Sequence, residues 1–119
     1  MRIVFFGTPI FAANNLQYLI SKNHNIIAVV TTPDQKKGRG NKYISSDVKK
    51  IAQDNNIPVL ESLSLTEELF ITQLKELKSE LFVVVAFKKL PEEIWTLPEK
   101  GTINLHASYL PHYRGAAPI

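Results

Sequence analysis

The sequence predicts an α/β protein with an open, mostly parallel, doubly wound sheet, Rossmann-like and incomplete at its C-terminus. Short apolar runs alternate with segments whose apolar residues recur at helical spacing, a pattern typical of βαβ units. Gly7 ends the first apolar run and allows a tight strand-to-helix turn. The run at 82–86 is continuous, as expected of a central strand buried on both faces.

The first half of the chain should form strand, helix, strand, loop and helix. Residues 2–6 form the first strand, and Thr8 should cap a helix in which Pro9 takes the first position. The second strand covers 26–30. Residues 32–46 are polar and basic, so we expect a loop of unusual length there. Ser46 then caps a short helix.

The second half continues the alternation. Pro58 favours an edge position for a strand at 57–59. Residues 64–67 have the pattern of a capping box, which predicts a helix with Phe70 and Leu74 on its buried face. A brief helix opens at Pro91, and 102–105 form the next strand. In such a sheet, ligands are expected at the carboxyl ends of the strands.

Composition excludes several classes of protein. The 119 residues are enough for one domain, and the net charge of +3 is mild. The absence of cysteine excludes a disulfide scaffold, a thiolate zinc site and a cysteine nucleophile. The longest apolar run, 81–87, is too short to cross a bilayer, and residues 1–6 lead straight into a turn without the pattern of a signal peptide. We expect a cytoplasmic monomer without membrane or metal.

Asn104 and His106 are the candidate catalytic residues. In an extended strand they point to the same face, so both can reach one small object. An amide can hold a developing oxyanion while an imidazole handles a proton, which suits acyl transfer. A histidine near a strand end is also often a satisfied structural residue, and an asparagine there can be a strand-end cap.

The loop at 32–46 is a candidate nucleic-acid contact. Asp34 is the acidic residue nearest to its cluster of four cations, Lys36, Lys37, Arg39 and Lys42. A charged surface loop can equally be no more than solvated. A dinucleotide or a P-loop nucleotide is not expected, because the glycines that should accompany Gly7 are missing and no Walker A lysine motif is present.

Taken together, the segments resemble the folate-dependent formyltransferases, in order and over all 119 residues. The matching segments are 6–12, 31–34, 38–40, 83–87 and 103–119. The last is specific to this group of enzymes. The Gly-Arg-Gly of 38–40 and the Gly-Thr-Pro of 7–9 narrow the match to the members that act on methionyl-tRNA.

The resemblance implies transfer of a formyl group from the cosubstrate 10-formyltetrahydrofolate to the α-amino group of methionyl initiator tRNA, in translation initiation. It makes Asn104 and His106 two catalytic residues, with an aspartate downstream of Ile119 as the third. Arg39 becomes the carried-over tRNA contact. Folate-binding residues follow from the two matching segments: Phe87, Lys88, Lys89 and Leu90 along the pterin, and Ser108, Tyr109, Leu110 and Pro111 in a folate loop. Tyr109 departs from the family's leucine there.

On this reading, residues 1–119 are the N-terminal portion of a catalytic domain. The rest of that domain and a C-terminal β-rich domain lie outside the chain, and we expect these residues alone not to catalyse the reaction. Two alternatives remain open. One is a folate-dependent formyltransferase that acts on a small amine. The other is a non-catalytic α/β module that binds nucleotides or RNA.

Overall fold

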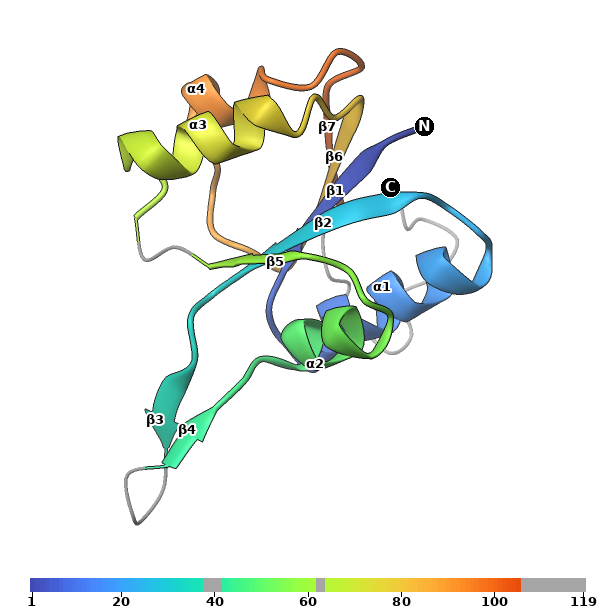
Figure 1. Cartoon of the computed structure of the whole chain (residues 1–119), viewed down its shortest axis with the longest axis vertical. Helices are drawn as coiled ribbons and strands as arrows, with labels where there is room; N and C mark the ends of the chain where they lie inside the picture. Colours follow the sequence, from blue (N-terminus) through green and yellow to red (C-terminus); the bar gives the residue numbers. More distant parts are fainter. Residues whose placement is uncertain (38–41, 62–63, 106–119) are drawn as a thin grey trace, which may run out of the picture.

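The structure is a computed structural model that describes residues 1–37, 42–61 and 64–105, with the backbone alone for 35–37 and 42–44 (Figure 1). In this part of the chain the elements follow in the order β1 (Ile3–Gly7), α1 (Ile10–Ser21), β2 (Ile26–Thr31), β3 (Gln35–Lys37), β4 (Lys42–Ile44), α2 (Asp47–Asp54), β5 (Val59–Glu61), α3 (Glu68–Glu76), β6 (Leu81–Val85), α4 (Glu92–Trp95) and β7 (Thr102–Leu105). None of the described helices is long and apolar enough to cross a membrane.

The main sheet has the strand order β5-β2-β1-β6-β7, and all its pairings are parallel. From β1 the chain moves outward to β2 and β5, then crosses to the other side of β1 to form β6 and β7. The winding direction therefore changes between β1 and β6, and sheets of this kind bind ligands beyond the strand ends at that point. The predicted fold class is confirmed. So is the edge position near Pro58, since β5 is an outer strand.

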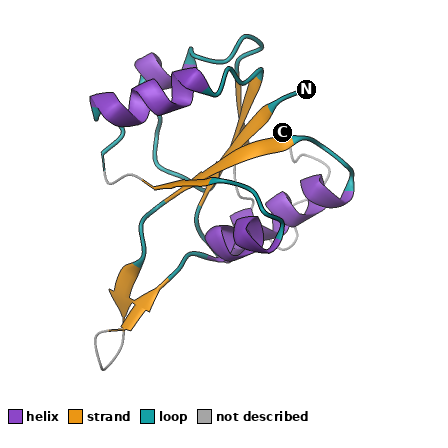
Figure 2. Cartoon of the chain, viewed as in Figure 1, coloured by secondary structure: helices purple, strands orange, loops and turns teal. Residues whose placement is uncertain are grey.

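Helices cover both faces of the main sheet (Figure 2). Beneath α3 and α4, the fully buried rings of Phe6 and Phe82 lie with their centroids 4.9 Å apart. On the opposite face, α1 contributes Leu16 and α2 contributes Val48 to a second cluster. Each fully buried side chain of this size stabilises the fold by about 2 kcal/mol. The two clusters pack against both faces of β1 and β6, the strands between which the winding changes.

Gly7 lies where β1, α1 and β6 converge. A Cβ at this position would lie 2.6 Å from the Cβ of Ala12 and 2.8 Å from the carbonyl oxygen of Val85. The φ of Gly7 lies outside the left-handed region. The glycine is therefore needed because helix and strands approach closely here, and not because the turn requires a positive φ.

Helix α1 begins later than predicted. Its first residue is Ile10, Pro9 stands in the cap position, and no side chain caps the helix. The hydroxyl of Thr8 instead accepts hydrogen bonds from the backbone N–H of Thr32 and from the Thr31 hydroxyl, both at 3.4 Å. The prediction of a Thr8 cap was wrong because a tertiary partner competes for the hydroxyl.

The predicted capping box at 64–67 is also wrong. Helix α3 begins at Glu68, and Glu67 occupies the cap position without a side-chain hydrogen bond. The Ser64 hydroxyl lies 3.0 Å from the Thr66 hydroxyl and accepts from the Thr66 backbone N–H at 3.4 Å. These residues form a turn before the helix, since the serine bonds locally two residues ahead.

Residues 32–46 are not a loop throughout. β3 and β4 pair antiparallel, with Gln35 opposite Ile44 and Lys37 opposite Lys42. We call this two-stranded unit the ribbon; it projects away from the main sheet and its helices (Figure 1). The sequence did not predict it, because each strand has only three residues and no apolar alternation.

Candidate active site

Asn104 lies on β7, the outer strand beside β6, opposite Val84 in the register. Its side chain is exposed and shares a face with Thr102, as alternation along a strand requires. Both residues line a cavity of about 230 Å³ whose other walls include Lys89, Leu90 and Trp95. The structure therefore brings the predicted catalytic amide together with two predicted folate-binding residues.

A second cavity, of about 520 Å³, lies alongside. It is lined by the turn at 64–66, the segment 88–92 and Trp95. Lys89, Leu90 and Trp95 line both cavities. The two hollows therefore share one wall, and together they are large enough for a drug-sized heterocyclic ligand.

Trp95 and Thr102 were not identified from the sequence. Trp95 is the only tryptophan of the chain, and it is 46% exposed. The Thr102 hydroxyl donates a 2.8 Å hydrogen bond to the carbonyl oxygen of Trp95, which ties the end of α4 to β7. The position of Thr102, two residues before Asn104, was a signal that could have been used. Nothing in the sequence marks Trp95.

The exit from β6 bends sharply at Ala86, whose φ is 50°. An alanine in the left-handed region costs about 1–2 kcal/mol, so the surrounding packing must hold it there. The bend follows Val85, the partner of Gly7 in the register. It therefore lies at the point where the winding of the sheet changes.

The predicted pterin segment contains residues with different surroundings. The Phe87 ring is partly buried and meets the Phe6 ring edge-on, with centroids 5.8 Å apart. Phe87 does not line either of the two cavities described above. Lys88 lines the larger cavity, and the buried Leu90 lines both. Phe87 thus anchors the segment to the core while its neighbours face the cavities.

Three hydroxyls join the carboxyl ends of β1 and β2 to α2. The Thr31 side chain is fully buried, and its Oγ1 lies 2.8 Å from Ser46 Oγ and 3.4 Å from Thr8 Oγ1. Ser46 also accepts a 3.0 Å hydrogen bond from the backbone N–H of Lys49. This confirms Ser46 as the helix cap, and it adds a buried partner that the sequence did not indicate.

An ion-pair cluster lies at the same edge. The Lys49 ammonium is 3.0 Å from Asp34 Oδ1 and 3.4 Å from both carboxylate oxygens of Glu61. The hydrogen bond to Asp34 raises the pKa of Lys49 above its usual value, and the Glu61 carboxylate adds to the rise against the opposing effect of burial. Lys49 is therefore charged at neutral pH.

Several predicted site residues lie outside the described part of the chain: His106, Ser108, Tyr109, Leu110, Pro111 and Arg39. Their roles stay predictions. Lys36 and Lys37 lie on β3, and Lys42 begins β4; for these three only the backbone is described. Within the described residues, no group of three or more histidine or acidic side chains is placed to hold a metal ion.

Comparison with known proteins gives consistent results. Residues 1–119 match the sequence profile described as formyl transferase. Curated methionyl-tRNA formyltransferases from Bacteroides fragilis and Desulforamulus reducens are 50% and 52% identical to this chain over 119 and 120 residues, respectively. A third, from Clostridioides difficile, is 50% identical over 120 residues. All of this chain is covered, but only 37%, 38% and 39% of those proteins.

A solved structure agrees in fold. The phosphoribosylglycinamide formyltransferase of Coxiella burnetii superposes with a TM-score of 0.62 at 24% identity, over 98% of this chain and 56% of that one. At this identity the likeness concerns the fold alone. The profile match and the relatives near 50% identity go further, and by them this chain belongs to the formyl transferase family.

Proposed function

We propose that this chain is part of an enzyme that transfers the formyl group of 10-formyltetrahydrofolate to the α-amino group of methionyl initiator tRNA, in the cytoplasm and as a monomer. The observation that carries the proposal is the set of relatives near 50% identity that are named methionyl-tRNA formyltransferase. The cavity that Asn104 shares with Lys89 and Leu90 supports it. A formyl donor lying along that segment would bring its carbonyl near the Asn104 amide.

The chemistry needs few groups. The unprotonated amine attacks the formyl carbon, and the formyl oxygen gains negative charge in a tetrahedral intermediate. N–H donors from Asn104 and His106 stabilise that oxygen, and a donor of this kind typically contributes about 10²- to 10³-fold in rate. When the intermediate collapses, the C–N bond to tetrahydrofolate breaks, its nitrogen takes a proton, and the amine loses one.

The remaining predicted residues divide between the two substrates. The pterin would lie along Lys88, Lys89 and Leu90, with Phe87 as their anchor, and Trp95 offers an exposed aromatic surface beside them. In the proposal, the segment with Ser108, Tyr109, Leu110 and Pro111 completes the folate site. Acceptor tRNA would meet the ribbon through its cations, Lys36, Lys37, Arg39 and Lys42.

Replacing Asn104 by alanine tests the catalytic assignment. In the full-length protein, Asn104→Ala should lower the single-turnover rate by about 10²-fold or more and leave tRNA affinity nearly unchanged. Asn14→Ala, at an exposed position on α1, is the matched control. A near-normal rate in the Asn104 variant would refute its role.

Competition between acceptors tests the substrate class. Methionyl initiator tRNA should be formylated in preference to glycinamide ribonucleotide or an amino-sugar nucleotide. If a small amine is formylated in preference, the acceptor is a small amine and the proposal of tRNA as the acceptor is wrong. RNA binding without any affinity for the folate donor would favour the non-catalytic alternative.

A further inference from the structure

We propose that Lys49 is a positioning residue that fixes the base of the ribbon to the main sheet and thereby sets how the ribbon meets its RNA partner. The inference rests on the proposed function for the identity of that partner. It does not rest on the proposed function for the anchoring itself, which the contacts of Lys49 support independently.

The ammonium of Lys49 joins three separate elements. Lys49 belongs to α2, Asp34 precedes the first strand of the ribbon, and Glu61 ends the edge strand β5. The hydrogen bond to Asp34 is 3.0 Å, and the two to Glu61 are 3.4 Å. The Lys49 side chain is only 15% exposed, compared with 32% and 29% for its partners. The entry of the ribbon is thus tied to the sheet edge through one cation.

The same residue also holds the exit of the ribbon. The chain leaves β4 at Ile44 and reaches Ser46, whose hydroxyl accepts from the Lys49 backbone N–H at 3.0 Å. Ser46 in turn lies 2.8 Å from the hydroxyl of the fully buried Thr31, the last residue of β2. The segments that enter and leave the ribbon are therefore both attached to Lys49. The entry is held by the Lys49 side chain and the exit by the Lys49 backbone N–H.

The attachment depends on the positive charge of Lys49. Two carboxylates share one ammonium, so removing it would leave Asp34 and Glu61 near each other without compensation. Because the ribbon projects from the body of the molecule, its direction depends on its base (Figure 1). A change at the base would be enlarged at the far end of the ribbon.

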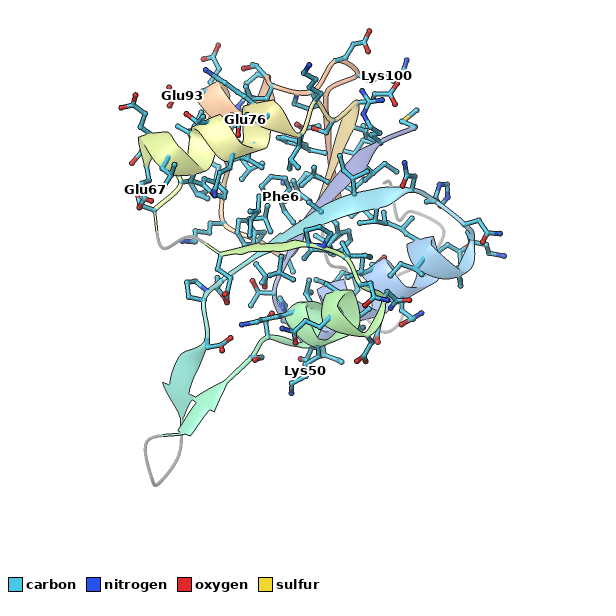
Figure 3. The ribbon with its side chains drawn as sticks, in the orientation of Figure 1. Phe6, Lys50, Glu67, Glu76, Glu93 and Lys100 are labelled. Carbon is cyan, nitrogen blue, oxygen red and sulfur yellow. The ribbon has the colours of Figure 1, made fainter. Side chains whose placement is uncertain are left out.

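The test compares three variants in the full-length protein. Lys49→Met removes the charge at similar length, and Lys49→Arg keeps it. The matched control is Lys50→Met at the next residue, which is exposed and points away from the sheet (Figure 3). Lys49→Met should lower kcat/KM for initiator tRNA by about tenfold through KM, as expected for loss of a charge-assisted hydrogen bond. The KM for the folate donor should not change, and Lys49→Arg should retain most of the activity.

A distance measurement reads the anchoring directly. Residues 1–119 contain no cysteine, so spin labels can be placed at Tyr43→Cys on β4 and Gln17→Cys on α1, with any cysteines elsewhere in the protein replaced. The distance distribution should be narrow in the wild type and the Lys50 variant, and broader in Lys49→Met. If Lys49→Met fails to fold, Asp34→Asn replaces it, since Glu61 still pairs with the ammonium there.

The outcomes separate the two proposals. An unchanged distribution in folded Lys49→Met or Asp34→Asn would overturn the anchoring. A broadened distribution with an unchanged KM for tRNA would overturn the effect on RNA recognition. If the wild type does not formylate methionyl-tRNA at all, the proposed function fails, whereas the distance measurement still decides the role of Lys49.

Discussion

The two ends of the same sheet differ in how they use their polar groups. At the amino end, the backbone N–H of Arg2 donates to Glu80 Oε1 at 2.8 Å, and its guanidinium donates to the carbonyl oxygen of Lys78 at 2.7 Å and 2.9 Å. Glu80 returns a 2.8 Å backbone hydrogen bond to Arg2, and Lys100 donates another to the Glu80 carbonyl. These hydrogen bonds join the start of β1 to the segments that precede β6 and β7.

At the carboxyl end, polar groups surround cavities and the ribbon instead. Asn104 lines a cavity, the hydroxyls of Thr31 and Ser46 meet at the base of the ribbon, and Lys49 joins two carboxylates. The chain diverges at this end because the connections after the parallel strands β1 and β6 lead to opposite sides of the sheet, towards β2 and β7, which opens space for a ligand. The amino end therefore uses its polar groups to tie the chain together, whereas the carboxyl end combines contacts that stabilise the fold with groups that line space for a ligand. Mutations at each end test this division.

The largest expected effect is at Gly7, at the carboxyl end. Gly7→Ala should lower the free energy of unfolding by about 2–3 kcal/mol, because the new Cβ would overlap Ala12 and the Val85 carbonyl. Urea denaturation measures it.

Gly101 at the amino end provides the contrast, since a Cβ there meets nothing within 4 Å and its cost comes from a φ of +96°. Ala12→Gly should therefore relieve part of the damage of Gly7→Ala and none of that of Gly101→Ala. Equal relief in both would show that crowding is not the cause at Gly7.

A smaller effect is expected at Ser46. Ser46→Ala removes the cap of α2 and takes a close partner from the buried Thr31 hydroxyl, so the free energy of unfolding should fall by about 1–2 kcal/mol. Ser21→Ala is the matched control, because that hydroxyl bonds an exposed carbonyl near the end of α1. Its effect should stay within about 0.5 kcal/mol. If urea denaturation gives the same loss of unfolding free energy for both variants, the buried contacts of Ser46 stabilise the fold no more than an exposed hydroxyl does.

The smallest effect is the pH dependence of the amino end. The hydrogen bond from the Arg2 backbone N–H lowers the pKa of Glu80 from its ordinary value of 4.5, with the Arg2 charge adding to it against desolvation. A carboxyl with a lowered folded pKa stabilises the protein above its unfolded pKa, and this contribution disappears as pH falls through the folded pKa.

Glu80→Gln should therefore be slightly less stable than wild type at pH 7, with the gap closing as pH falls below about 4.5. Glu93→Gln on the exposed surface of α4 controls for the loss of one charge (Figure 3). Thermal melts over this pH range measure both. If the difference in stability between Glu80→Gln and wild type does not change with pH, the charge of Glu80 does not stabilise this end of the sheet.

Sequence alone determined the fold class, the order of the main-sheet strands along the chain and the position of Asn104 near a strand end. These features follow from the alternation of apolar runs with helical spacing, because backbone geometry converts such spacing into buried faces locally. The edge position near Pro58 and the Ser46 cap also depend on local chemistry, and the structure confirms both.

Only the tertiary structure decided which distant residues meet. Thr8 bonds the end of β2 instead of capping α1, and Lys49 pairs with residues 15 and 12 positions away, Asp34 and Glu61. The cavity beside Asn104 likewise depends on Trp95, held there by Thr102. Such contacts depend on strand order and on the direction of the chain after each strand, and local spacing carries no information about either. The pairing of the ribbon could not be predicted for the same reason: its strands of three residues pair through backbone hydrogen bonds, and runs this short leave no clear periodicity in the side chains.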